Sequence, residues 1–474
     1  MTTPTLAPTA VSTNRLQYDR FLAAVDVDRM RTRLLDVTGL GRGSGIAVVD
    51  AKLEPGRPAV VLYRVGDRLV HGTVPVPESE SVPVHGDTDE PDIILSSYPD
   101  DPGLPGLPCA ESPACLARSI GQGCLDGPVP VAHVETRLLR YRPGRRATFE
   151  VRARMGDPVG EDPRRFVAKV YHDPDKAAAV VREGRELAEQ SPAAPLVLAR
   201  VLAHDIERAI VVQEHLPGRI LTLDLDAAPA PQAMSELDGA AAALAAFHGL
   251  SVSGGRHRPL ERELRRFVTR ATGVRSVDVR TGDALLELAH RLLGLPRPDR
   301  ATSLVHGDCK PAQFLLGGSR VALLDLDHCG LADPAYDVGN FVASLRQQAV
   351  QHSQQAVQHS RQAVQHSRQA VQTSGQAGQG GFPSPHHSPD RLDAALRLGD
   401  TFVAAYVAAS ASAGVAAQHE ATAETRLQER VETFVAVSLM RKALRAFARD
   451  PHSPVPLRLV AEAHRGLDHP GGES

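Results

Sequence analysis

The sequence lacks tryptophan and contains very little lysine. Only five lysines occur among its 474 residues: Lys52, Lys169, Lys176, Lys310 and Lys442. Arginine therefore supplies most of the positive charge, and each lysine marks a position worth examining. The 53 Lys and Arg residues nearly balance the 56 Asp and Glu residues, which argues against a polybasic nucleic-acid surface or an acidic tail.

The chain also lacks a long apolar run and a regular cysteine pattern. No segment approaches the ~20 apolar residues that a membrane-spanning helix needs, and the N-terminus has no cationic start followed by an apolar core, so we expect no membrane partner and no secretory signal. Cys109, Cys115 and Cys124 follow a C-x₅-C-x₈-C spacing that does not suit zinc, although a zinc site is the alternative. We expect reduced thiols in a cytoplasmic protein. The abundance of Arg, Ala, Pro and Gly is typical of a GC-rich bacterial genome.

Residues 1–130 are predicted to form a separate N-terminal α+β module of unknown role. A short amphipathic helix is expected over Tyr18–Leu35 and strands over Ile46–Leu53, Ala59–Val65 and Arg68–Val76. From Pro77 to Gly127, Pro, Gly, Asp and Ser dominate, which indicates a linker with one short helix around Ala114–Ile120.

Residues 131–218 have the pattern of a small antiparallel sheet interrupted by one helix. The expected strands are Leu138–Tyr141, Thr148–Arg154, Phe166–Tyr171, Leu196–Leu202 and Ala209–His215, with a helix over Asp175–Gln190. Residues 219–474 are mainly helical. Seven-residue units beginning Gln-Ala-Val-Gln interrupt this region at 348–381, where Ala and Val are too small for a coiled-coil seam. We expect a disordered or marginally helical insertion there, with metal binding by His352, His359 and His366 as the alternative.

The stretch from Leu304 to Phe341 contains the candidate catalytic and metal-binding residues. An apolar run ends in His306-Gly-Asp308, Gln313 follows five residues after Asp308, and a second apolar run ends in Asp325 and Asp327. Two strands that each end in carboxylates can hold one isolated carboxylate opposite a metal-binding one, as phosphoryl transfer requires.

These residues resemble the catalytic loop of the aminoglycoside phosphotransferase and choline kinase-like family, whose pattern is HGDxxxxN followed by a metal-binding Asp. The resemblance covers roughly Val134 to Leu467 and implies a two-lobed, protein-kinase-like α+β fold. It also implies that Asp308 is the catalytic residue and that Asp325 binds Mg²⁺, assisted by Asp327 or with Asp327 bonding the loop. His306 is expected to brace the loop, while Asp333 and Asp337 are expected to cap turns and the following helix.

Gln313 departs from the family, which usually has Asn there as a metal ligand. Gln offers the same amide oxygen on a longer stem, so Gln313 either binds the metal or marks weakened binding.

The resemblance also indicates the nucleotide-binding residues. Lys169, on the third strand of the small lobe, is expected to contact the ATP phosphates and to pair with Glu183, or alternatively with Glu186. Glu214 and His215 occupy the hinge, where backbone groups would bind adenine. Lys310 is placed to contact the γ-phosphate, or else is a solvated charge; Arg145 and Arg146 are weaker candidates for phosphate contact.

Two functions follow from these residues. The first is ATP- and Mg²⁺-dependent phosphorylation of a hydroxyl on a small molecule, such as an aminoglycoside, a sugar or an amino alcohol. The acids of the last helices are interleaved with arginine, which does not favour a polycationic acceptor. The alternative is a nucleotide-binding pseudokinase that serves as a regulatory interaction protein, a reading supported by Gln313 and the incomplete glycine-rich loop.

Overall fold

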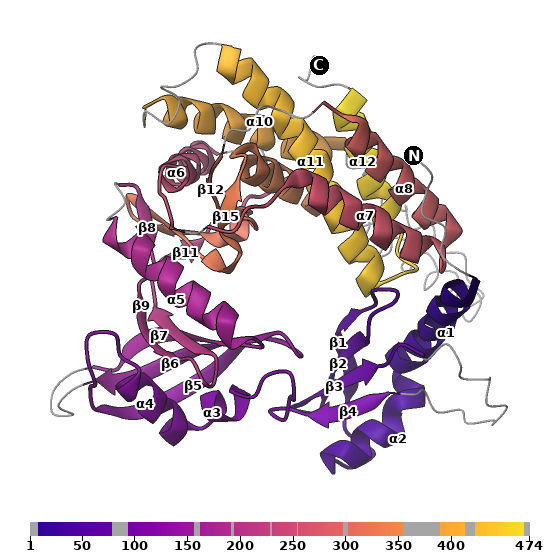
Figure 1. The fold of residues 1–474 in the computed structure, drawn as a ribbon, viewed down its shortest axis with the longest axis vertical. Helices are drawn as coiled ribbons and strands as arrows, with labels where there is room; N and C mark the ends of the chain where they lie inside the picture. The colour runs from indigo at the N-terminus through magenta and orange to yellow at the C-terminus, as the bar shows by residue number, and fades with distance from the viewer. Residues whose placement is uncertain are drawn as a thin grey trace, which may run out of the picture.

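The chain folds into three parts, which lie one beside another in Figure 1. The computed structural model describes residues 8–77, 93–155, 162–190, 194–227, 230–253, 255–296, 302–353, 389–412 and 422–468. An N-terminal module and a small antiparallel lobe (the N-lobe) lie next to a larger, mainly helical lobe (the C-lobe). The predicted α+β organisation, with a small antiparallel lobe, a mainly helical lobe and an extra N-terminal module, is confirmed.

The N-terminal module is a four-stranded antiparallel sheet with two helices. Its helices are α1 (Pro8–Val25) and α2 (Val27–Thr38), and its strands are β1 (Ile46–Lys52), β2 (Ala59–Val65), β3 (Arg68–Val74) and β4 (Ile94–Ser97). The single helix expected over Tyr18–Leu35 is wrong because Asp26 separates two helices. Its carboxylate accepts the Asp28 and Arg29 N–H groups at 3.0 and 3.3 Å and so caps α2.

The segment predicted as a linker is packed on the N-lobe. Helices α3 (Leu107–Glu111) and α4 (Pro113–Gln122) bury Leu107 and Leu116 in the same core as Phe149 of the sheet. Cys109 and Cys115 form a disulfide across these two helices, with their Cα atoms 5.2 Å apart. The expectation of reduced thiols is therefore wrong for this pair, whereas Cys124 is free.

The N-lobe sheet has the strand order β5-β6-β7-β10-β9. Its elements are β5 (Val131–Arg142), β6 (Arg146–Met155), β7 (Arg164–Tyr171), α5 (Pro174–Glu189), β9 (Val201–Asp205) and β10 (Ile210–Glu214). The strand expected over Leu196–Leu202 is instead two strands. β8 (Leu196–Leu198) leaves the N-lobe to pair in parallel with β14 (Arg320–Leu323) of the C-lobe.

The C-lobe surrounds two small sheets with helices. Its strands are β11 (Arg219–Ile220), β12 (Ser303–Val305), β13 (Phe314–Gly317), β14 and β15 (Gly330–Ala332). Its helices are α6 (Pro231–His248), α7 (Leu260–Arg275), α8 (Val279–Gly294), a helix over 335–353, α10 (Pro389–Ser412), α11 (Thr422–Arg449) and α12 (Val455–Asp468). Its core includes Phe341 stacked on Phe402 at 3.7 Å. The first residues of the predicted insertion continue the helix to 353, and the rest of 348–381 lies outside the described residues.

The N-terminal module is docked against the C-lobe helices. The Leu53 N–H donates to the Ala448 carbonyl oxygen at 2.6 Å, and the Asn14 amide donates to Ser276 Oγ at 3.0 Å. In Figure 1 the module lies beside the ends of α7 and α11. None of the described helices is long and apolar enough to cross a membrane.

Candidate active site

The site is built on the β12–β15 strand pair and the β13–β14 hairpin of the C-lobe. β12 ends at Val305 and leads into the loop of His306 and Asp308, and the short helix Pro311–Gln313 then leads into β13. β13 pairs antiparallel with β14, so that the Leu324 N–H donates to the Gln313 carbonyl oxygen at 2.8 Å. This bond places Gln313 at the mouth of the hairpin, next to the strand end that carries Asp325.

Asp337 holds the catalytic loop from below. Its carboxylate accepts the His306 N–H at 2.5 Å and the Gly307 N–H at 2.9 Å, and it also bonds His248 Nε2 at 3.1 Å. Burial acts to raise the pKa of Asp337, but these hydrogen bonds and the neighbouring histidines hold it below its ordinary value. The expectation that Asp337 caps a helix is wrong, because its carboxylate is committed to the loop. Asp333 does cap the helix over 335–353, through the Ala335 N–H at 2.9 Å.

His306 braces the loop as predicted. Its Nδ1 accepts the Asp308 N–H at 3.2 Å, so Nε2 carries the proton and donates to the Leu324 carbonyl oxygen at 2.7 Å. One ring thus ties the Asp308 loop to the strand end before Asp325. Gly307 has φ +77°, and a Cβ there would lie 2.3 Å from the His328 carbonyl oxygen, so the loop requires glycine.

Asp308 is an ionised carboxylate held by a single lysine. Its Oδ2 lies 2.6 Å from Lys310 Nζ. Burial acts to raise the pKa of Asp308, but the charge and hydrogen bond of Lys310 outweigh burial and lower this pKa to about 2. Asp308 can therefore accept a proton from a hydroxyl at neutral pH.

Asp325 and Asp327 face two cations from the N-lobe sheet. Lys169 Nζ lies 3.0 Å from Asp325 Oδ1 and 2.7 Å from Asp327 Oδ1. Arg146 binds both oxygens of Asp325, at 2.8 and 3.0 Å, and also contacts Asp327. Burial opposes ionisation, but Lys169 and Arg146 hold the pKa of Asp325 far below its ordinary value. Asp325 also has φ +60°, a strained backbone position for a residue with a side chain.

Sequence reasoning gave Arg146 only a weak role at phosphate and did not foresee its ion pairs. A signal was present in the strand alternation. Thr148 pairs with Lys169 across β6 and β7, and Arg146 lies two residues before Thr148 on the same face. The register therefore directs Arg146 and Lys169 toward the same edge of the C-lobe.

The structure does not bring Lys169 together with Glu183 or Glu186. Glu183 forms its ion pair with Arg182, at 3.9 Å, and burial raises the pKa of Glu183. Glu186 accepts the Ser253 N–H and hydroxyl, both at 2.6 Å. Lys176 of α5, by contrast, donates to the Asp327 carbonyl oxygen.

Glu214 and His215 lie where β10 leaves the N-lobe toward β11. The Glu214 N–H donates to the Arg200 carbonyl oxygen at 2.9 Å, and the Glu214 carboxylate lies 3.5 Å from Arg200 Nε. The predicted hinge residues are thus at the junction of the lobes, on the N-lobe side.

Residues 158–372 match the model of the phosphotransferase enzyme family. The matched range includes Lys169, Asp308 and Asp325, so the resemblance drawn from the sequence is confirmed there.

Several solved structures are similar to this chain at low identity. A choline kinase from Cryptosporidium parvum Iowa II is 12% identical, with 71% of this chain and 89% of that chain covered and a TM-score of 0.45. A choline/ethanolamine kinase family protein from Mesorhizobium loti is 14% identical, with 71% and 89% covered and a TM-score of 0.39. A macrolide 2'-phosphotransferase from Brachybacterium faecium is 16% identical, with 69% and 95% covered and a TM-score of 0.36. No curated protein matches the chain.

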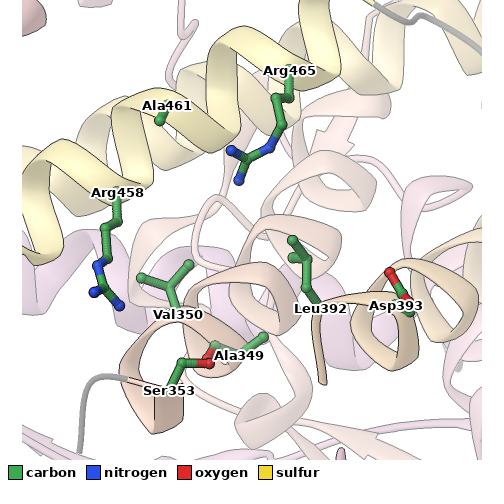
Figure 2. A pocket seen from close by; sticks show the side chains of 8 residues that line it. All are labelled: Ala349, Val350, Ser353, Leu392, Asp393, Arg458, Ala461 and Arg465. Atoms are coloured by element: carbon green, nitrogen blue, oxygen red, sulfur yellow. The ribbon is translucent and has the colours of Figure 1, made fainter. Parts of the chain in front are cut away.

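A cavity of about 330 Å³ lies elsewhere in the C-lobe, between α12, α10 and the helix over 335–353. Figure 2 shows Arg458 and Arg465 of α12 on one side of this cavity and Val350 and Leu392 on the other. Its lining contains none of the predicted site residues.

Proposed function

We propose that the protein is an ATP-dependent phosphotransferase that transfers the γ-phosphate to a hydroxyl group of a small molecule. The observation that carries this proposal is the arrangement of two loops, one after β12 and one after β14. They present ionised Asp308 on one loop and Asp325 with Asp327 on the other, joined by His306 and facing Lys169 of the N-lobe. A protein catalyses phosphoryl transfer mainly by positioning the reactants and stabilising charge, and carboxylates and cations can do both.

The residues at Asp325 fit a magnesium ion. Asp325, Asp327 and the Gln313 side chain offer oxygen atoms, and Mg²⁺ is usually bound by one or two carboxylates together with water and phosphate oxygens. Bound there, Mg²⁺ would neutralise charge on the nucleotide phosphates. Lys169 and Arg146 already lie at these carboxylates, so both are placed to turn toward phosphate oxygens when the nucleotide enters.

Asp308 is proposed to orient the acceptor hydroxyl and take its proton. Its low pKa keeps it ionised across the neutral range, and Lys310 fixes one carboxylate oxygen and leaves the other for the hydroxyl. Lys310, as the nearest cation to Asp308, is proposed to stabilise charge on the phosphoryl group in transit. Glu214 and His215 are proposed to present backbone groups to adenine.

The pseudokinase alternative has one structural observation in its favour. Lys169, the expected phosphate ligand, forms ion pairs with two aspartates, whereas Glu183 pairs with Arg182. A phosphotransferase must exchange these ion pairs for phosphate and metal, whereas a pseudokinase could keep them.

One experiment separates the two functions. ADP release would be followed with Mg²⁺, ATP and a panel of small hydroxyl compounds, for the wild-type protein and for Asp308→Asn, while a fluorescent ATP analogue reports nucleotide binding. We expect acceptor-dependent ADP release by the wild type, a fall of about 10²–10⁴-fold in Asp308→Asn, and unchanged nucleotide affinity. Nucleotide binding without turnover for any acceptor would favour the pseudokinase.

A further inference from the structure

Three cationic side chains of α11 act on Asp308 through their charge. α11 carries Arg441, Lys442 and Arg445, and Arg441 and Arg445 are about one helical turn apart. Arg441 pairs with Glu263 at 2.7 Å and donates to the Tyr336 hydroxyl at 2.8 Å. Its charge also acts on Asp308, which places this face of α11 toward the catalytic loop.

A chain of hydrogen bonds joins Lys442 to the loop. Lys442 Nζ donates to Ser344 Oγ at 3.0 Å, and Ser344 Oγ donates to the Asn340 carbonyl oxygen at 2.7 Å. The Asn340 amide donates to the carbonyl oxygen of Cys309, the residue after Asp308, at 2.7 Å. Lys442 is therefore fixed beside the catalytic loop.

Arg445 completes this face and is not committed to a carboxylate. Its side chain is exposed, and within the described chain it forms no ion pair or hydrogen bond that would neutralise it. Its charge acts on Asp308, Arg441 and Lys442. Burial and then the charge of Arg445 lower the pKa of Lys442 to about 7, as expected where cations meet without enough anions.

Helix α7 and the turn between β5 and β6 add further cations. Arg270 of α7 is affected by the charges of Arg145, in the turn between β5 and β6, and of Arg441. Glu54 of the N-terminal module lies 3.4 Å from Arg270, but it also pairs with Lys52 at 2.6 Å. The module thus contributes residues next to the catalytic face of the C-lobe.

The charges around Asp308 do not balance. Besides the Asp325 and Asp327 pairs, the cations that act on one another or on Asp308 include Arg145, Arg270, Lys310, Arg441, Lys442 and Arg445. Three carboxylates stand against them: Asp308, Glu54 and Glu263. Among the described acids of the last helices, Glu432 instead pairs with Arg346 at 2.8 Å, and Asp393 lines the cavity of Figure 2.

We propose that the acceptor is an anionic hydroxyl compound whose carboxylate or phosphate group binds Arg445 and its cationic neighbours while its hydroxyl meets Asp308. This inference rests on the proposed function and names its substrate class. An anion would neutralise the excess positive charge, and the planar guanidinium of Arg445 can bind carboxylate or phosphate through two parallel hydrogen bonds. The same cations repel a polycationic acceptor.

The test compares acceptors by charge. Initial rates of ADP release would be measured for four groups of compounds: small hydroxycarboxylates, sugar phosphates, neutral sugars, and cationic amino alcohols with aminoglycosides. We expect the highest kcat/KM in one of the two anionic groups, and which of them leads decides between carboxylate and phosphate. A highest kcat/KM for a neutral or cationic compound would overturn the inference and leave the proposed function intact.

Arg445 provides the matched variants. For the best anionic acceptor we expect Arg445→Gln to raise KM about 10–100-fold with a smaller effect on kcat, and Arg445→Lys to recover part of the loss. Arg458→Gln, an exposed arginine at the cavity of Figure 2, is the control and should leave both constants unchanged. Equal KM values for wild type and Arg445→Gln would contradict the inference.

Binding of the acceptors can be measured even if none of them is phosphorylated. Such a failure would count against the proposed function, and the same panel would then be titrated calorimetrically into wild type and Arg445→Gln. Binding of anionic compounds that weakens at least tenfold in the variant would support the anion site. No anion binding, or binding that the variant does not weaken, would overturn it.

Discussion

Arg146 binds Asp325 through two hydrogen bonds, Nη1 to Oδ1 at 2.8 Å and Nη2 to Oδ2 at 3.0 Å. This pair joins the first hairpin of the N-lobe to the metal-binding end of the C-lobe across 179 residues of sequence. The same carboxylate must serve the metal in the proposed reaction. The Asp325 carboxylate can therefore either bind Arg146 and hold the two lobes together, or bind the metal of the proposed reaction.

Arg146→Gln should destabilise the nucleotide-free protein. Removing one partner leaves a buried carboxylate less compensated, which costs about 1–3 kcal/mol. Thermal unfolding would measure the loss, and added Mg²⁺ and ATP should stabilise the variant more than the wild type because the carboxylate is then free for metal. Arg152→Gln, on an exposed part of the same strand, is the control. If nucleotide-free Arg146→Gln were as stable as the wild type, the ion pair would contribute nothing to the free energy of unfolding.

Asp337→Asn should slow catalysis although Asp337 is a positioning residue that lies below the loop. An amide cannot accept both the His306 and Gly307 N–H groups as a carboxylate does, so the loop that carries Asp308 should shift. We expect kcat to fall about 10–100-fold, while KM for ATP changes little. Asp333→Asn tests a cap on the same helix and should affect stability more than kcat. A wild-type kcat in Asp337→Asn would refute the positioning role.

Lys442→Met should change how stability depends on pH. The pKa of Lys442 is lowered from 10.5 to about 7 in the folded chain, so between these values the unfolded chain binds a proton that the folded chain does not. The contribution of Lys442 to the free energy of unfolding therefore rises with pH through this window. The methionine variant should be more stable at pH 7, by about 1–3 kcal/mol, and its advantage should shrink toward pH 10. Chemical denaturation at several pH values measures both, and parallel profiles for the two proteins would contradict the shifted pKa.

Gln313 can be tested by returning the residue usual in the family. If its amide oxygen contributes to metal binding, Gln313→Asn should keep or improve the Mg²⁺ concentration needed for half-maximal rate. Gln313→Ala should raise that concentration about 10-fold or more, as the loss of one ligand group does. Equal magnesium dependence in all three proteins would exclude Gln313 as a ligand.

The Cys109–Cys115 disulfide should stabilise the packing of α3 and α4 on the N-lobe. In the chain-entropy account, closing so short a loop contributes about 2 kcal/mol. Thermal unfolding with and without reductant would measure this contribution, with Cys124→Ser as a control for the free thiol. An unchanged melting temperature on reduction would mean that the bond contributes nothing to stability.

Local periodicity predicted most of the elements. The strand Ala59–Val65 has the bounds that its apolar pattern predicts, because the pattern is satisfied by neighbours near in sequence. The bracing role of His306 was also predictable, since the loop motif is short and self-contained.

Long-range partners were not predictable from the sequence. β8 is separate from β9 and pairs in parallel with β14 of the C-lobe, and the Asp337 carboxylate accepts N–H groups of a loop some thirty residues earlier in the chain. Lys169 was expected to pair with Glu183, but it bonds two aspartates more than 150 residues away in the sequence. The cations near Asp308 come from α7, α11, the turn between β5 and β6 and the catalytic loop itself, so their excess is visible only when the fold brings these segments together.

The central claim is that Asp308 and the Asp325 site transfer phosphate to a hydroxyl compound, and following the γ-phosphate itself tests this most directly. ATP labelled at the γ-phosphate would be incubated with Mg²⁺ and the acceptor panel, and the label traced in wild type and Asp308→Asn. We predict label in a phosphorylated acceptor with the wild type and almost none with the variant. Label found only as inorganic phosphate, or equal transfer by both proteins, would contradict the account.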